Sequence, residues 1–287
     1  MFLTITFLGA LGASGAALLY AVSKKFHVEE DPRIGEVQEA LPGANCGGCG
    51  FPGCGGFASA CAKASSLEGL FCPVGGAETM AKVADILGLA AVQSEPLVAV
   101  VRCNGNCDAR PRTNTFDGVS SCAVATALYS GETNCSYGCH GLGDCVRVCD
   151  FGAISINPET KLPEVDQDKC TACGACVKAC PKFIIELRKK GPKNRRVFVS
   201  CVNKDKGGVA KKACANACIG CSLCFKECKF EAITIANNLS YIDHTKCRLC
   251  RKCVSVCPTK AIHEIGFPPP KPKVEETESP AAKTEQV

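Results

Sequence analysis

The 287-residue chain contains no tryptophan, and aromatic residues make up only 6% of it. Hydrophobic residues reach 46%, but a core without large rings buries little surface per side chain. Such a core needs another source of folding energy. Bound metal can supply it, because ligation and folding are coupled in small metal-binding domains. The length leaves room for two or three small domains.

The sequence also lacks the residue sets of common enzymes. It contains no nucleotide-binding loop, no Ser–His–Asp set and no paired acid–base motif, and its four histidines are scattered. The glycines at 48, 50 and 53 match G-x-G-x-x-G, but they follow no predicted strand, so we reject dinucleotide binding there. We therefore expect no substrate-converting site in this chain.

Cysteine, by contrast, is abundant, with 26 residues. Three stretches share the spacing C-x2-C-x2-C-x3-C and begin at Cys170, Cys218 and Cys247. This spacing ligates [4Fe–4S] clusters in bacterial ferredoxins, where three thiolates bind one cluster and the fourth binds its neighbour. Proline follows the first and third stretches, as in that motif, and Lys229 follows the second.

Disulfides and zinc are the alternative uses of these cysteines. Disulfides are typical of secreted proteins, and thiols three residues apart are too close for ordinary disulfide geometry. Zinc sites join two C-x2–4-C pairs across a longer loop, so a zinc-binding interaction protein is the less favoured alternative. Evenly spaced cysteines favour Fe–S clusters.

The spacing predicts two ferredoxin modules with crossed ligand sets. The second module is expected to hold two clusters, one on Cys218, Cys221, Cys224 and Cys257, the other on Cys247, Cys250, Cys253 and Cys228. The regular set of the first module is Cys170, Cys173, Cys176 and Cys149.

The other set of the first module is irregular, because Leu142 stands where the spacing requires a cysteine. Cys135 is the candidate replacement. The predicted set is then Cys135, Cys139, Cys145 and Cys180. A three-iron cluster is the alternative at this site.

A fifth set lies near the N-terminus and stands alone. It consists of Cys46, Cys49, Cys54 and Cys72, surrounded by glycines that let backbone N–H groups approach the sulfurs. Cys61 is interpreted as a buried helix residue. A sixth cluster is an open alternative to free thiols at Cys103, Cys107, Cys122 and Cys201, with Cys214 also left over. We therefore expect five [4Fe–4S] clusters, or six.

The N-terminal segment from Phe2 to Val22 carries no charge. About 20 apolar residues suffice to span a bilayer, and Lys24 and Lys25 follow the segment. The positive-inside rule then predicts a single-pass anchor in the cytoplasmic membrane, with the clusters on the cytoplasmic side. A cleaved signal peptide is the alternative, but it would carry its charges before the apolar stretch.

The formal charge of +5 is poor evidence for nucleic-acid binding. Five oxidised clusters with their thiolates would add roughly −10. A basic stretch over 188–196 is interpreted as a solvated loop, or as a docking site for an acidic carrier such as ferredoxin.

The expected fold class is α+β, with an N-terminal transmembrane helix, a small helical single-cluster domain and two ferredoxin-like modules in a pseudo-repeat. Each module is preceded by a strand and a helix, and each contains a short hairpin. The expected segments are 1–25, anchor; 26–90, single-cluster domain; 91–133, connector; 134–190, first module; 191–216, connector; 217–266, second module; 267–287, disordered tail.

An apolar N-terminal helix, a lone C-x2-C-x4-C…C-P site and ferredoxin modules behind it resemble the B-type subunits of the Rnf complex, the ion-translocating ferredoxin:NAD oxidoreductase. The resemblance extends to about Ile265. It implies a translocase subunit that relays electrons from reduced ferredoxin to flavin-bearing and multi-span membrane subunits. A polyferredoxin-like carrier, or an Fe–S subunit of another membrane or carbonyl-metabolising complex, is the alternative.

Overall fold

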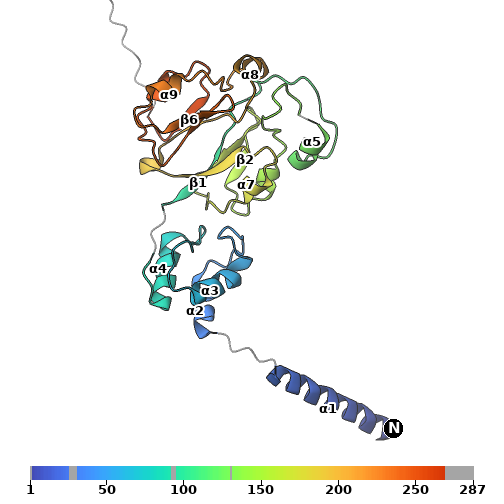
Figure 1. Cartoon of the computed structure of the whole chain (residues 1–287). Coiled ribbons are helices and arrows are strands. Elements are labelled where there is room, and N and C mark those ends of the chain that lie inside the picture. The colour runs from blue at the N-terminus through green and yellow to red at the C-terminus, as the bar shows by residue number, and fades with distance from the viewer. Residues whose placement is uncertain (1, 26–30, 92–94, 130, 269–287) are drawn as a thin grey trace, which may run out of the picture. The chain divides into compact units, whose positions relative to one another are not determined.

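The computed structural model describes residues 2–25, 31–91, 95–129 and 131–268. The chain divides into two compact units, Met1–Ser94 and Glu95–Val287 (Figure 1). The expected disordered tail falls almost entirely on residues 269–287, which lie outside the described ranges. The finer seven-segment division stays a prediction.

The first element, α1 (Phe2–Lys25), is a 24-residue helix. The expected transmembrane helix is nevertheless wrong: within the described residues, no helix combines the length and the apolar character needed to cross a membrane. Gly9, Gly12 and Gly15 lie along α1 with open space around them, and residues without side chains add little to the free energy of transfer into hydrocarbon.

Three further helices form the rest of the first unit: α2 (Pro32–Ala40), α3 (Gly53–Lys63) and α4 (Gly76–Leu87). The carboxylate of Asp31 accepts the backbone N–H of Arg33, and Pro32 occupies the first turn, which together start α2. The helices enclose one small core that includes Phe57, Met80 and Val83.

The second unit contains two copies of one α+β arrangement. In the first copy, β1 (Leu97–Val101) pairs antiparallel with β4 (Ile185–Lys189). The hairpin β2 (Ile154–Ile156) and β3 (Pro163–Val165) lies between them in sequence. The helices are α5 (Cys122–Leu128), α6 (Asp144–Arg147) and α7 (Ala175–Ala179).

The second copy repeats this order. Here β5 (Arg196–Val199) pairs with β8 (Ile262–Ile265), and β6 (Ile233–Ala236) forms a hairpin with β7 (Leu239–Ile242). The helices are α8 (Gly207–Ala213), α9 (Leu223–Glu227) and α10 (Lys252–Ser255), and a short 3-10 turn, η1 (Pro192–Asn194), joins the copies. The mixed α/β ferredoxin-like architecture is thereby confirmed.

The two copies meet where β1 and β5 end. The backbone N–H of Asn104 donates to the carbonyl of Ser200 at 3.1 Å, and the Ser200 hydroxyl donates to the carbonyl of Val101 at 3.4 Å. We call this boundary between the two copies the seam. Two arginines also lie at it: Arg102 and Arg188 are each 5.1 Å from the ring centre of Tyr241 on β7. These contacts bring Cys103 and Cys201, which follow the two strands, to the same place.

Candidate iron–sulfur sites

A pocket in the first unit is lined by all four cysteines of the predicted N-terminal set: Cys46, Cys49, Cys54 and Cys72. The Asn45 side chain accepts the backbone N–H of Cys54 at 2.8 Å, which folds the loop back on itself. The backbone N–H of Gly75 donates to Cys72 Sγ at 3.3 Å. Gly53 has φ +85°, and a Cβ there would lie 2.8 Å from Asn45 Oδ1, so this turn requires glycine.

Cys61 lies on α3 and is completely buried in the core of the same unit. It is absent from the lining of the cysteine pocket. Burial raises the pKa of its thiol to about 11, with a smaller contribution from the charges of Cys49 and Cys72. Its position matches that of a packing residue.

The regular set of the first module also lines one pocket, with Cys149, Cys170, Cys173 and Cys176 around it. Ala153 donates its backbone N–H to Cys149 Sγ at 3.3 Å, and Ala99 on β1 donates to Cys170 Sγ at 3.5 Å. Burial raises the pKa of Cys176 to about 12, followed by the charges of the neighbouring thiolates.

At the irregular set the structure places a different cysteine from the one the sequence suggests. The pocket is lined by Cys122, Cys139, Cys145 and Cys180. Cys135 is not among its lining residues. Burial raises the pKa of Cys145 to about 11, and the next contributions come from Cys122 and Cys180.

Asp144 explains how Cys122 reaches this pocket. Its carboxylate accepts the backbone N–H groups of Cys122 at 2.8 Å and Ala123 at 3.0 Å, and the Ser121 hydroxyl at 3.1 Å. The start of α5 is thereby fixed beside Cys145, the next residue after Asp144. Burial alone would raise the pKa of Asp144, but these hydrogen bonds outweigh it and the pKa is lowered.

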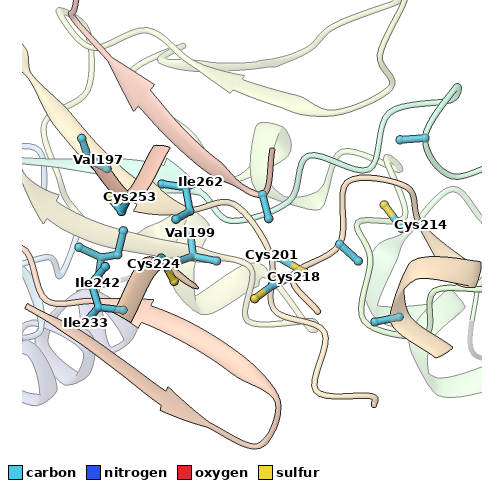
Figure 2. Close-up of a cluster of buried hydrophobic side chains, with 14 residues drawn as sticks. Val197, Val199, Cys201, Cys214, Cys218, Cys224, Ile233, Ile242, Cys253 and Ile262 are labelled. Atoms are coloured by element: carbon cyan, nitrogen blue, oxygen red, sulfur yellow. The ribbon is translucent and has the colours of Figure 1, made fainter. Parts of the chain in front are cut away.

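In the second module the crossed ligand sets stay a prediction, because the charges of Cys224 and Cys228, one from each predicted set, both act on Cys253. The pKa of Cys224 is raised by burial and then by the charges of Cys218, Cys221 and Cys257. Burial raises the pKa of Cys253 to about 12, with Cys247 and Cys250 as the next contributors. Cys224 and Cys253 are buried among Val199, Ile233, Ile242 and Ile262 (Figure 2).

Four of the remaining cysteines line one further pocket: Cys103, Cys135, Cys201 and Cys214. Two members of the suggested sixth set lie elsewhere. Cys107 is exposed, and Cys122 lines the irregular pocket. Sequence spacing alone missed Cys135 and Cys214 in this grouping. The one signal for it was the repeat, which places Cys103 and Cys201 after equivalent strands.

The donor sets of these pockets suit a [4Fe–4S] cluster. Each pocket offers four thiols, and each of the four thiolates of such a cluster binds a different iron. Backbone N–H groups directed at Cys72, Cys149 and Cys170 supply the hydrogen bonds that such sulfurs accept.

Comparison with protein families covers the same regions. Models described as "4Fe-4S dicluster domain" match residues 134–184, 169–231 and 217–262. A model described as "Putative Fe-S cluster" matches residues 41–68. The dicluster matches span both modules, and the fourth match spans three of the four N-terminal cysteines.

Three curated relatives resemble nearly the whole chain, and each is the B-type subunit of a named complex. The relative from the Na(+)-translocating ferredoxin:NAD(+) oxidoreductase complex of Acetobacterium woodii is 44% identical, over 89% of this chain and 75% of the relative. The relative from the ion-translocating oxidoreductase complex of Methanosarcina acetivorans is 40% identical, over 90% and 96%. The relative from the proton-translocating ferredoxin:NAD(+) oxidoreductase complex of Clostridium ljungdahlii is 40% identical, over 88% and 87%.

Proposed function

Because this chain belongs to the family of B-type subunits of ion-translocating oxidoreductase complexes, we propose that it relays electrons from reduced ferredoxin to other subunits of such a complex. It is an electron-transfer Fe–S subunit of an oxidoreductase complex and contains [4Fe–4S] domains. The observation that carries the proposal is the grouping of cysteines from distant segments into separate four-thiol pockets.

The ligands of four clusters are proposed as the spacing predicts. They are Cys46, Cys49, Cys54 and Cys72; Cys149, Cys170, Cys173 and Cys176; Cys218, Cys221, Cys224 and Cys257; and Cys228, Cys247, Cys250 and Cys253. At the irregular site, Cys139, Cys145 and Cys180 are three of the four ligands. Each bound cubane supplies a centre that takes up and releases one electron.

The protein's own residues keep these centres in place and adjust their surroundings. The thiols are crowded and partly buried, so their pKa values rise in the absence of a cation, and ligation to iron keeps them as thiolates. Backbone N–H groups, such as those of Gly75 and Ala153, donate to sulfur and favour the reduced state.

We propose that ferredoxin docks at part of the basic stretch 188–196. Arg188 and Arg196 are buried, so they do not face a partner. Lys193 is exposed and Arg195 is half-buried. These two cations would attract an acidic carrier at long range.

We also propose that the complex is a translocase, that its remaining subunits include flavin-bearing and multi-span proteins, and that the clusters face the cytoplasm. Ion translocation requires a membrane, and the names of the relatives support this part. Among the described residues no two cysteines are joined in a disulfide, which suits a reducing compartment.

The test is anaerobic purification of the full chain followed by mixing with ferredoxin that has been reduced chemically. We expect a brown protein containing iron and sulfide, whose broad visible absorption bleaches on mixing with ferredoxin. Chelator-treated protein is the control. A colourless protein containing zinc would contradict the proposal, and iron-bound protein that ferredoxin does not reduce would remove ferredoxin as donor. Copurification with flavin-containing partners then separates a member of a complex from a free carrier.

A further inference from the structure

The seam between the two ferredoxin modules contains a four-cysteine pocket that belongs to neither module's regular ligand sets. Its thiols come from four separate segments: Cys103 after β1, Cys135 before α6, Cys201 after β5 and Cys214 at the end of α8. Cys201 and Cys214 are buried, as is Cys135.

The backbone fixes this convergence at several points. Besides the Asn104–Ser200 bond, the Asn216 side chain donates to the carbonyl of Asn104 at 3.0 Å. The backbone N–H of Ala215 donates to the carbonyl of Ala109 at 2.8 Å. The residues flanking Cys103 and Cys214 are therefore tied to each other, so the grouping of their thiols does not depend on side-chain rotation alone.

The same pocket has N–H donors directed at sulfur. Asn203, with 1% of its surface exposed, donates its side-chain amide to Cys135 Sγ at 3.6 Å. Its backbone N–H donates to Cys201 Sγ at 3.5 Å. N–H groups also donate to sulfur in the other cysteine pockets, and such hydrogen bonds stabilise thiolates that are bound to iron.

An arginine completes the lining. Arg110 donates to the carbonyl of Cys139 at 2.7 Å, and its buried Nε has no hydrogen-bond partner among the described residues. A Cβ on Gly138 would lie 1.8 Å from Arg110 Nη1. The absence of a side chain at Gly138 therefore leaves room for the Arg110 guanidinium at the edge of this pocket. Arg110 is half-buried, and its positive charge beside four thiols offsets part of the negative charge of an anionic cluster.

We propose that Cys103, Cys135, Cys201 and Cys214 hold a sixth [4Fe–4S] cluster in this seam, and that Cys122 replaces Cys135 as the fourth ligand of the irregular site. The inference rests on the proposed Fe–S function. It gives a ligand role to Cys214, which spacing leaves unassigned, and it accounts for the missing ligand at Leu142.

The pocket lies next to ligands of both modules. The charge of Cys103 acts on Cys139 of the irregular site. On the other side, Cys201 and Cys218 belong to one cluster of buried side chains. Figure 2 shows Cys201 beside Cys218 at one end of the second module's core, with Cys214 beyond them. A cluster in this pocket therefore stands between a site of each module.

The experiment measures iron and acid-labile sulfide per full-length chain, after anaerobic reconstitution, together with the EPR spectrum of the reduced protein. Six clusters give about 24 iron, and five give about 20. The double variant Cys103→Ala/Cys214→Ala removes two ligands from the seam pocket alone. We expect it to lose about four iron and to keep the EPR signals of the regular clusters, which shows that it folds.

The matched control is Cys61→Ala/Cys107→Ala, which removes two thiols outside every proposed set and should keep the full iron content. A wild-type protein with about 20 iron, unchanged by the Cys103/Cys214 substitutions, would overturn the sixth cluster. Wild-type protein with almost no iron would instead contradict the proposed Fe–S function itself, so the two failures are distinguishable.

The exchange of Cys122 and Cys135 is tested on the background of the Cys103/Cys214 double variant. Adding Cys135→Ala should remove no further iron, because its cluster is already lost. Adding Cys122→Ala should remove iron or convert a cubane signal into a three-iron signal. The opposite pair of results would return Cys135 to the irregular site.

Discussion

At the residue scale, glycines decide how closely the cysteine loops can fold. Gly220 lies between the predicted ligands Cys218 and Cys221 and has φ +65°. A Cβ at this position would lie 2.7 Å from the carbonyl oxygen of Asn238 in the β6–β7 turn. A side chain would therefore have to move the hairpin or the ligand loop.

We predict that Gly220→Ala lowers the free energy of unfolding of the full chain by about 1–3 kcal/mol, from left-handed backbone strain plus the clash. Anaerobic denaturant titration checks the value, and iron content reports displacement of Cys221. The matched control is Gly208→Ala, because Gly208 lies in α8 with no atom within 4 Å of a new Cβ. Equal stability of both variants would contradict this reading of Gly220.

At the element scale, α5 depends on one carboxylate outside the helix. Asp144 accepts hydrogen bonds from Ser121, Cys122 and Ala123. The helix has only seven residues, too short to be stable by itself in water. Tertiary hydrogen bonds therefore decide where Cys122 lies.

We predict that Asp144→Ala destabilises the protein by about 1–3 kcal/mol, because it removes three hydrogen bonds at the start of α5 and leaves the part-buried N–H of Cys122 without its partner. Amide hydrogen exchange in α5 should accelerate. Asp150→Ala is the control, since Asp150 is exposed. The lowered pKa of Asp144 also sets how stability depends on pH. The ionised carboxylate makes its full contribution to the free energy of unfolding above the ordinary pKa of 3.8, and this contribution is lost as the pH falls through the lower pKa of the folded state.

The elements themselves were predicted unevenly. Leu97–Val101 and both hairpins follow from apolar, β-branched runs and turn residues, and the structure confirms them. The strands β4 and β8, which close each copy, were missed. In β4, Arg188 is buried although it is charged, so the alternation of apolar and polar residues does not reveal the strand. The Arg188 guanidinium lies over the rings of Phe198 and Tyr241.

At the scale of the whole molecule, the seam between the modules depends on two arginines stacked on Tyr241. Arg102 also donates to the carbonyls of Val199 and Cys201, both at 3.3 Å. Both Nη groups of Arg188 lack hydrogen-bond partners among the described residues. The ring faces of Phe198 and Tyr241 are therefore the main partners of the Nη side of the Arg188 guanidinium.

We predict that Tyr241→Ala lowers the free energy of unfolding by about 2–4 kcal/mol, through loss of ring burial and of two cation–π contacts. Tyr241→Phe is the matched control and should stay near wild type, because the ring face is kept. Thermal unfolding under anaerobic conditions measures both. If the two variants are equally unstable, the hydroxyl rather than the ring face is the important group.

Removal of iron should affect the whole molecule. Cysteines make up much of the core of the second module, where Cys201, Cys214, Cys218, Cys224 and Cys253 are buried. We predict that chelation of the oxidised clusters unfolds both modules, because iron then no longer joins the separate segments that carry the cysteines, and the remaining apolar core is small. Hydrogen exchange should show loss of protection in β5 and β8. Full retention of protection would show that the apolar core suffices.

The sequence by itself determined the local cysteine sets, the hairpins and the Fe–S chemistry, because ligands three residues apart on one loop are placed by short-range backbone geometry. It also suggested a membrane helix that the described structure does not contain. Only the tertiary structure decided the seam. Cys103, Cys135, Cys201 and Cys214 are far apart in sequence and meet because β1 and β5 end side by side, an arrangement that depends on long-range contacts rather than on spacing.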